Sequence, residues 1–343
     1  MAEITSRERV LTTFMHKTPD QVPMWCGASR EFWNKAKLAL GLDDEALRIR
    51  FHDDFRRVSS VYNGDALPDN TTVFGVKRHG IGYGHAVNHP LCQANMRDIE
   101  SYIWPDPKWI DVSKIKFEAR AYKKKYAILG GEWPPFWHDA IDLLGMEQLY
   151  ILMYEQPEIV DCILKHIVDY YFEVNRCIFD AAADEIDICF IGNDFGSQTG
   201  PLLGRSLFDR FIIPHLKIII DLAHDYKLKA MLHCCGGIEP LIPPLIEIHL
   251  DAIHAVEPSC SGMDLTELKR KYGDKIVFNG GIDSHHVLID GDKEYVRKTT
   301  VKVLDILAPN GGYIAGASHD SILEETPVEN VLAMFDTIRD YCM

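Results

Sequence analysis

The stretch Leu228-Lys229-Ala230-Met231-Leu232-His233-Cys234-Cys235-Gly236 decides which fold and which chemistry this chain suggests. Its short apolar run is typical of a buried strand that ends near His233. Because side chains alternate along a strand, His233 and Cys235 face the same way and Cys234 faces the opposite way. An imidazole beside a thiol can chelate a borderline cation such as zinc. The alternative is a buried histidine between apolar cysteines, and these residues alone leave both interpretations open.

Seven other segments also predict short buried strands, several of them as continuous apolar runs of the kind found in parallel sheets. Helical patterns separate the later strands, among them 157–183 and a last helix opened by Thr326-Pro327-Val328-Glu329 as a capping box. Eight strands alternating with helices in 343 residues predict a single (β/α)8 barrel domain over 1–343. The eight predicted strands are 22–27, 55–62, 127–132, 186–193, 228–235, 252–257, 275–280 and 312–317.

A doubly wound open sheet is the alternative architecture, but the glycine fingerprint of a nucleotide-binding unit is absent. The run Gly80-Ile81-Gly82-Tyr83-Gly84 does not follow a strand and enter a helix. The region 65–107 is rich in Gly, Pro, Asn and His, and we expect it to form an elaborated loop over one end of the barrel.

Net charge, the length of apolar runs and the cysteine spacing indicate which binding partners and which cellular compartment to expect. The net charge is −15 and no basic stripe is present, which argues against nucleic acid and anionic membrane as partners. No apolar run approaches the ~18 residues that a membrane span requires. The nine cysteines follow no disulfide spacing, and the polar N-terminus does not resemble a signal peptide. We therefore expect a cytoplasmic protein with reduced thiols.

If the barrel is correct, the carboxyl ends of its strands carry the chemistry. Polar or aromatic residues stand at these ends, each of which also has a structural interpretation as a turn, cap or pairing residue. A structural zinc site normally has four protein ligands at close spacing, whereas here only His233 and Cys235 are close, which favours a catalytic site with an open position. The candidates at the strand ends are Trp25, Glu132, Trp133, Asn193, Asp194, His233, Cys235, Glu257, Asn279, Asp283, Ser318, His319 and Asp320.

Cys235 beside His233 also admits a second chemistry, that of an activated thiolate nucleophile. Residues two apart on one strand lie side by side, whereas a catalytic dyad usually takes its base from elsewhere in the fold. The metal-site interpretation of this pair is therefore the stronger one.

Over nearly its whole length the chain resembles the uroporphyrinogen decarboxylase superfamily, which implies a (β/α)8 barrel. Decarboxylases of this superfamily bind a tetrapyrrole with many carboxylates through arginines just after the first strand. The segment 26–32 holds only Arg30, next to Glu31, so porphyrinogen decarboxylation is not expected. The motifs that carry the resemblance are at 22–25, 102–107, 192–198, 233–236, 280–283, 311–313 and 326–330.

The second branch of the superfamily is the corrinoid-dependent methyltransferases, which include methylcobamide:coenzyme M methyltransferases and the methyl-donor-specific enzymes of O-demethylase systems. Their hallmark is a zinc site made of His-x-Cys on the fifth strand and a late Cys at the eighth. His233 and Cys235 match, but the late Cys is missing from 315–320, where His319, or Glu257 from the neighbouring strand, is the expected substitute. The chain looks more similar to the O-demethylase group than to the thiol-methylating members.

The resemblance thus implies a zinc-dependent methyltransferase that moves a methyl group between a small methylated donor, such as a methoxylated compound, and cobalt. The Asp-x-His-x-x-Gly signature of a corrinoid-binding domain is absent, so a partner protein is expected to present the corrinoid. Zinc would act as a Lewis acid on the atom that bears the methyl group. The expected catalytic residues are Asp194, Glu257 and His319, and the expected donor contacts are Trp25, Trp133, Asn193 and Asn279.

Two other functions stay open on the sequence. One is a metal-free decarboxylase of a small or tetrapyrrole carboxylic acid, in which Asp194 or His319 steers protonation of the carbanion. The other is a corrinoid- or tetrapyrrole-binding chaperone without catalytic activity, for which His233 and Cys235 would be dispensable.

Overall fold

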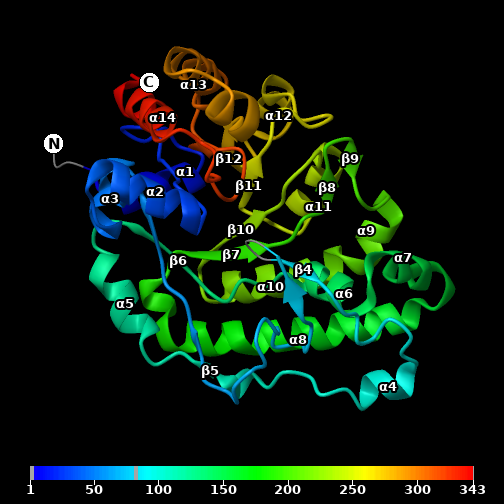
Figure 1. The fold of residues 1–343 in the computed structure, drawn as a ribbon. Helices are drawn as coiled ribbons and strands as arrows, with labels where there is room; N and C mark the ends of the chain where they lie inside the picture. The colour runs from blue at the N-terminus through cyan, green and yellow to red at the C-terminus, as the bar shows by residue number, and fades with distance from the viewer. Residues whose placement is uncertain (1–3, 81–83, 343) are drawn as a thin grey trace.

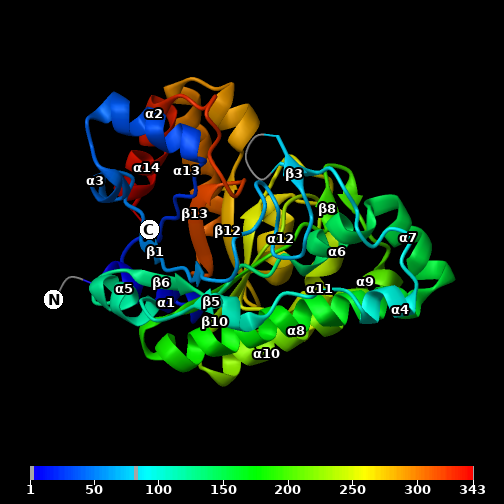
Figure 2. The same ribbon diagram turned by 60° about the horizontal axis from the view of Figure 1, so that its bottom comes forward.

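A curled parallel sheet of seven strands organises the chain, whose computed structural model describes residues 4–80 and 84–342 (Figures 1 and 2). Every neighbouring pair in the sheet is parallel. Six of the seven strands fall within segments predicted as strands from the sequence, and β12 overlaps the predicted 275–280 but continues to Ile282. In sheet order they are β1 (Phe55–Arg57), β6 (Ala127–Gly130), β7 (Ile188–Gly192), β10 (Lys229–His233), β11 (Ala252–Val256), β12 (Val277–Ile282) and β13 (Tyr313–Ala317).

The predicted first strand, 22–27, joins the two edges of this sheet. It forms only a single parallel bridge, between Met24 and Ala315 of β13, and the Trp25 N–H donates to the Ala315 carbonyl at 2.9 Å. On its other side, the Asp54 N–H donates to the Met24 carbonyl at 3.0 Å, one residue before β1 begins. The segment therefore occupies the eighth strand position and closes the barrel. The predicted (β/α)8 barrel architecture is confirmed, with its first strand reduced to one bridge.

Helices surround the sheet, with α8 running along one whole side of the molecule (Figure 1). This helix agrees with the predicted one at 157–183, whereas the predicted capping box at Thr326 is wrong, because α14 begins after Pro327 with no side-chain cap. The helices are α1 (Ser6–Phe14), α2 (Arg30–Leu40), α3 (Asp44–Arg50), α4 (Met96–Glu100), α5 (Ile115–Tyr122), α6 (Phe136–Leu144), α7 (Met146–Glu155), α8 (Pro157–Ala182), α9 (Arg205–Phe211), α10 (Ile213–Asp225), α11 (Ile242–Glu247), α12 (Leu265–Tyr272), α13 (Lys293–Leu307) and α14 (Val328–Asp340).

The inside of the barrel is filled by alternating strand side chains. Val10 and Phe14 of α1 join this cluster, and the Arg7 N–H of α1 donates to Lys125, just before β6. Helix α1 therefore closes the amino-terminal end of the barrel and leaves the carboxyl end, here called the mouth, for polar chemistry. The strand members of the cluster are Phe55, Ala127, Leu129, Ile188, Phe190, Met231, Ala252, Val277 and Ile314.

The predicted elaborated loop, 65–107, packs mainly along α6 and α8. The Leu91 N–H donates to Leu143 of α6 at 2.9 Å, and the Trp104 ring stacks on His166 of α8 with centroids 4.5 Å apart. Around it lie the short pairs β2 (Val61–Tyr62) with β5 (Ile110–Asp111) and β3 (Arg78–His79) with β4 (His85–Ala86). The glycine run at 80–84 lies partly outside the described residues.

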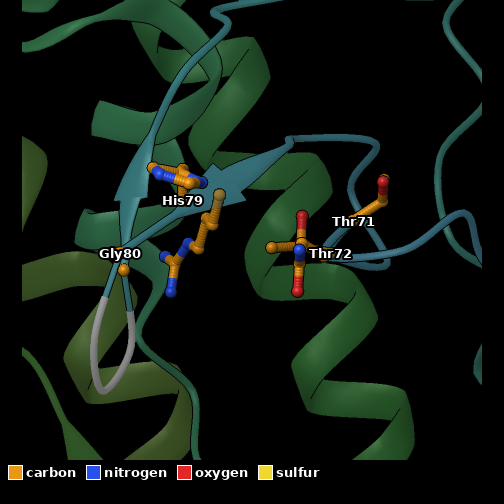
Figure 3. Close-up of a pocket in the computed structure, with 7 residues that line it drawn as sticks. Thr71, Thr72, His79 and Gly80 are labelled. Atoms are coloured by element: carbon orange, nitrogen blue, oxygen red, sulfur yellow. The ribbon is translucent and has the colours of Figure 1, made fainter.

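A polar cavity of about 620 Å³ lies within this loop region (Figure 3). Among its lining residues, Arg78 forms an ion pair with Asp142 of α6, and this ion pair connects the loop to the barrel. The lining residues are Asn70, Thr71, Thr72, Arg78, His79, Gly80 and Gly84.

Two other sequence expectations can be compared with the structure. All nine cysteines are free thiols, as the irregular spacing predicts. Within residues 4–80 and 84–342, no helix combines the length and the apolar character that crossing a membrane requires.

Asp54 links neighbouring segments of the barrel at the point where the segment 22–27 meets β1. Its carboxylate is 2 % exposed; Oδ2 accepts the Met24 N–H at 2.7 Å, and Oδ1 accepts from Arg9 Nη1 of α1 at 3.0 Å. Burial raises the pKa of Asp54, and the Arg9 charge is the main influence opposing that rise. One carboxylate thus joins the first strand, the start of β1 and the helix that closes the barrel.

We expect Asp54→Ala to lower the free energy of unfolding by about 3 to 5 kcal/mol, because it leaves the half-buried Arg9 charge and the Met24 N–H without this acceptor. Urea unfolding followed by circular dichroism measures the change. Asp69→Ala, at an exposed loop position, is the matched control and should change stability by less than about 0.5 kcal/mol. Equal effects of the two substitutions would contradict this role for Asp54.

Candidate metal centre at the barrel mouth

His233 and Cys235 lie side by side at the mouth, as the alternation of strand side chains predicts. His233 is the last residue of β10 and is 5 % exposed; its Nε2 atom is 3.3 Å from Cys235 Sγ. Cys234 faces the opposite way, into the hydrophobic layer behind the sheet, where its sulfur accepts the Phe195 N–H at 3.3 Å. The paired thiol and imidazole are therefore available to one ligand, and the second thiol is not.

Asp194 brings a carboxylate to the same place from the neighbouring strand. It follows β7, and its Oδ1 atom is 3.4 Å from His233 Nε2 while accepting the Cys235 N–H at 2.8 Å. One ligand atom from each of the three residues lies within 4.8 Å of the other two. Burial alone would raise the pKa of Asp194, but the neighbouring His138 and His233 rings and the hydrogen bond from the Cys235 amide hold it well below its usual range. Asp194 is therefore a carboxylate at neutral pH.

The donor set and its spacing fit zinc. At its usual bond lengths, tetrahedral zinc sets nitrogen, sulfur and oxygen ligands about 3.4 to 3.6 Å apart. The distances from His233 Nε2 to Cys235 Sγ and Asp194 Oδ1 are 3.3 and 3.4 Å. Burial, and next the Asp194 charge, raise the pKa of the Cys235 thiol, so a bare thiolate is costly here and a divalent cation would offset that cost. Three protein ligands with a fourth position open define a catalytic type of site.

His254 supports the other side of the His233 ring. The two residues are register partners on β10 and β11, and their Nδ1 atoms are 3.0 Å apart. Burial lowers the pKa of His254 well below its usual value, so this ring is neutral, and its Nε2 has no hydrogen-bond partner in the described residues. A ligand atom of Asp320 completes a second group with His233 and His254 within 4.8 Å. With Nδ1 of His233 engaged, its Nε2 is the atom left for a metal.

Aromatic rings form the floor beside this group. The Trp133 ring lies tilted over His233, with centroids 5.7 Å apart, and edge-on to Phe190 at 4.8 Å. Trp25 is 8 % exposed and packs on His254 at 4.7 Å. A Cβ added at Gly192 would lie 1.7 Å from the Trp133 ring, so glycine is required at the end of β7 for Trp133 to reach this position.

Glu257 and His319, predicted as catalytic residues or substitute ligands, lie outside the two groups just described. The Glu257 carboxylate accepts hydrogen bonds from the Ser318 hydroxyl and from the Ser259 N–H, which joins the loops after β11 and β13. His319 is exposed, and its Nδ1 is 3.0 Å from the Ser321 carbonyl. The structure therefore groups His233 and Cys235 with Asp194 rather than with either of these residues.

The two asparagines predicted to contact a donor are buried. Asn193 is 1 % exposed; its Oδ1 accepts the Trp137 N–H at 2.9 Å, which fixes the start of α6. Asn279 is fully buried, and its Oδ1 has no partner in the described residues. Of the four residues predicted to contact a donor, Trp133 is the one with partial exposure beside the metal group.

Sequence reasoning missed two histidines of this site. His254 was detectable, because it alternates inward with Ala252 on a predicted strand. His138 was not, because it comes from α6; its Nε2 accepts the Asp194 N–H at 3.0 Å and lies 3.4 Å from the Asp194 carboxylate, an ion pair only when the ring is protonated.

Comparison with known proteins identifies the family of this barrel. The uroporphyrinogen decarboxylase (URO-D) family profile matches residues 115–341, and the chain belongs to that family. A relative from Methanosarcina mazei, the methylcobamide:CoM methyltransferase MtbA, is 21% identical over 99% of this chain and 99% of its own length. MtbA of Methanosarcina acetivorans is also 21% identical, over 66% of this chain and 62% of the relative.

A solved structure agrees with the fold. It is a methyltransferase from Methanosarcina mazei, which superposes with a TM-score of 0.72 over 98% of this chain and 99% of its own, at 16% identity. The chain thus has the same barrel architecture as that protein. The expected resemblance to the uroporphyrinogen decarboxylase superfamily is confirmed.

A buried carboxyl group lies in α6 next to His138. Asp139 is 6 % exposed, and its Oδ2 accepts a hydrogen bond from the Tyr171 hydroxyl of α8 at 2.7 Å. Burial raises the pKa of Asp139 from 3.8 to about 7. The folded chain therefore holds a proton on Asp139 over a pH range in which the unfolded chain has lost it, so this group makes folding less favourable as pH rises from about 4 to 7.

Asp139→Asn should remove this pH dependence, because the amide mimics the neutral acid and keeps an acceptor for Tyr171. We expect the variant to exceed wild type in free energy of unfolding at pH 8 by up to about 4 kcal/mol, with little difference near pH 4. Urea unfolding across this range tests it. Asp209→Asn, in an exposed ion pair of α9, is the control, and a wild-type slope in Asp139→Asn would rule the explanation out.

Proposed function

We propose that this chain is a zinc-dependent methyltransferase that moves a methyl group between a small methylated compound and the cobalt of a corrinoid carried by a partner protein. The observation that carries the proposal is the group of His233, Cys235 and Asp194 at the mouth of the barrel. The similarity to methylcobamide:CoM methyltransferases over the whole chain supports it. A methoxylated donor is the proposed substrate on the ground that the late Cys is missing from 315–320, although the relatives that match are methylcobamide:CoM methyltransferases.

In this proposal His233 Nε2, Cys235 Sγ and Asp194 Oδ1 would hold the zinc, which would polarise the substrate atom that bears the methyl group. Asp194 takes the place that we expected for His319 or Glu257, because it lies within ligand distance of His233. When bound, zinc supplies a Lewis acid that makes this substrate atom a better leaving group, or stabilises a thiolate that accepts a methyl group.

The surrounding residues have separate tasks. His254 keeps the His233 ring in the orientation that points Nε2 at Cys235 and Asp194. The low pKa of Asp194 makes it a ligand and an orienting acceptor rather than a proton donor. Trp133 offers an apolar surface, partly exposed beside the group, against which the donor can lie while water is kept away.

Glu257 and His319 stay candidates for proton transfer at the edge of the mouth. Proton transfer through either residue would have to reach the substrate from the loops after β11 and β13, since Ser259 and Ser321 hold their side chains there. The corrinoid is assigned to a partner because the sequence lacks its binding signature, and a cytoplasmic location is proposed for the pair.

Metal binding gives the first test. We expect wild-type protein to bind one zinc per chain, His233→Ala and Cys235→Ala to lose it, and Asp194→Asn to bind it about 10- to 100-fold more weakly. Cys234→Ala is the matched control, because this neighbouring thiol faces away from the group and should not affect zinc. Zinc is measured by plasma emission spectroscopy and by competition with a chromophoric chelator. Equal zinc in Cys235→Ala and wild type would refute the site.

Methyl transfer gives the second test. With methoxylated aromatic donors and cobalt(I) cobalamin, we expect wild-type protein to convert cobalt(I) to methylcobalt, seen in the visible absorption spectrum. His233→Ala should lower the rate at least about 100-fold, since Lewis-acid stabilisation is worth several kcal/mol. Dependence of the rate on zinc, removed by chelation and restored by the metal, is the control. Carbon dioxide release from a carboxylic acid, unaffected by chelator, would support the decarboxylase alternative instead.

A further inference from the structure

Asn279 faces into the barrel at the level of the proposed metal ligands. It is the register partner of His254, which is in turn the register partner of His233, so the three residues lie side by side on β12, β11 and β10. Val277, two residues before Asn279 on the same strand, belongs to the interior cluster, and the Asn279 Nδ2 atom is 4.0 Å from the sulfur of Met231 in that cluster. Asn279 therefore lies one strand beyond the histidine that supports His233.

His254 and Asn279 each bury one polar atom that lacks a hydrogen bond. Both side chains are 0 % exposed, and neither His254 Nε2 nor Asn279 Oδ1 has a hydrogen-bond partner within residues 4–80 and 84–342. Folded proteins leave very few buried polar atoms unpaired, because each such atom has lost its hydrogen bonds to water. An imidazole nitrogen that can donate and an amide oxygen that accepts are complementary, and strand pairing brings the two side chains to neighbouring positions.

The contact between the two histidines decides where the proton of His254 lies. When a neutral His233 binds a metal through Nε2, its own proton is on Nδ1. The two Nδ1 atoms are 3.0 Å apart, so His254 Nδ1 accepts the hydrogen bond that His233 Nδ1 donates. His254 Nδ1 then carries no proton, and the proton of this ring is on Nε2. This tautomer needs an acceptor at His254 Nε2, and Asn279 Oδ1 is an acceptor to which no described residue donates.

We propose that Asn279 Oδ1 accepts a hydrogen bond from His254 Nε2, directly or across one water, and thereby fixes both histidines in the tautomers that leave His233 Nε2 for the metal. Asn279 is thus a positioning residue, which acts on the site through two imidazole rings. The inference rests on the proposed function, since it assigns Asn279 a task in the proposed zinc site. This task differs from the donor contact expected from the sequence and agrees with the full burial of Asn279.

Two other neighbours of His254 are competitors for this role. The Trp25 ring packs on His254 with centroids 4.7 Å apart, but an indole nitrogen is only a donor. Asp320, in the loop after β13, has a carboxylate oxygen within 4.8 Å of a ring nitrogen of His254, but it is partly exposed. Asn279 is favoured over Asp320 because its buried oxygen has no other donor in the described part of the chain, whereas a partly exposed carboxylate is also hydrated.

Nitrogen NMR tests the tautomers directly. In protein labelled with isotopic nitrogen at histidine, long-range proton–nitrogen spectra distinguish a protonated ring nitrogen from an unprotonated one. The signals of His233 and His254 are assigned by their loss in His233→Ala and His254→Gln. We expect His254 to be protonated at Nε2 and not at Nδ1, with zinc bound or absent, and His233 to be protonated at Nδ1. A proton on His254 Nδ1 in the wild-type protein overturns the inference.

Substitution of Asn279 gives the second measurement. Asn279→Leu removes the acceptor at nearly constant size and should weaken zinc binding about 10- to 100-fold, the usual cost of losing a hydrogen bond that orients a metal ligand. It should also leave His254 as a mixture of tautomers. Asn279→Asp keeps an oxygen acceptor and should restore both the zinc affinity and the single tautomer, a rescue that a purely structural role does not predict. Zinc affinity is measured by chelator competition, and folding is checked by circular dichroism.

Thr300→Val is the matched control. Thr300 lies on α13, is 0 % exposed, and its hydroxyl also has no partner among the residues that the structure describes. Its replacement by an apolar group of the same shape should leave zinc affinity and the His254 tautomer as in wild type. Asn279→Leu that matches wild type in both readouts overturns the inference, as does a change of tautomer in Asp320→Ala but not in Asn279→Leu.

The outcomes also separate this inference from the proposed function. A His254 Nε2 tautomer that is lost in Asn279→Leu, in a protein that binds no zinc, would establish the hydrogen bond to Asn279 and refute the metal site. Zinc binding that depends on His233 and Cys235, with His254 protonated at Nδ1, would leave the proposed function standing and refute the role of Asn279.

Discussion

Hydrogen bonding between parallel strands determines which side chains meet at the mouth of this barrel. Because strand side chains alternate, the register between two strands fixes which of their side chains face inward at the same level along the barrel axis. The pairing of His233 with His254, and of His233 with Gly192, places an imidazole partner on one side and room for Trp133 on the other. A shift of one residue on β10 would put Cys234 in the mouth and His233 behind the sheet, so the site depends on this register.

Burial of charge is the second constraint. Asp194 is kept ionised by donors around it, whereas the Cys235 thiol beside it is kept protonated by burial and by that same carboxylate. A carboxylate and a thiolate together in a half-buried group would repel each other, and His233 is the one neighbouring ligand that can donate to them. A divalent cation held by these residues would stabilise both anions, which is the physical reason for preferring a metal site to a buried His and Cys packed for stability.

The sequence was sufficient where the signal is local. The eight strand positions follow from apolar runs, and the facing of His233 and Cys235 follows from a period of two. The proposed third ligand could not be predicted from local sequence, because Asp194, Glu257 and His319 all follow strands. The directions of these side chains depend on contacts such as the hydrogen bond from the Cys235 N–H to Asp194 and the approach of His319 to the Ser321 carbonyl.

The charges at the mouth also separate the two branches of the family. A polycarboxylate substrate needs several cations, and the segment after the first strand, 26–32, contains only Arg30, at the start of α2. Arg57, an exposed residue at the end of β1, adds one charge, and its guanidinium contacts the Trp133 and Phe190 rings. A single exposed cation beside an aromatic surface does not supply the several charges that a polycarboxylate needs.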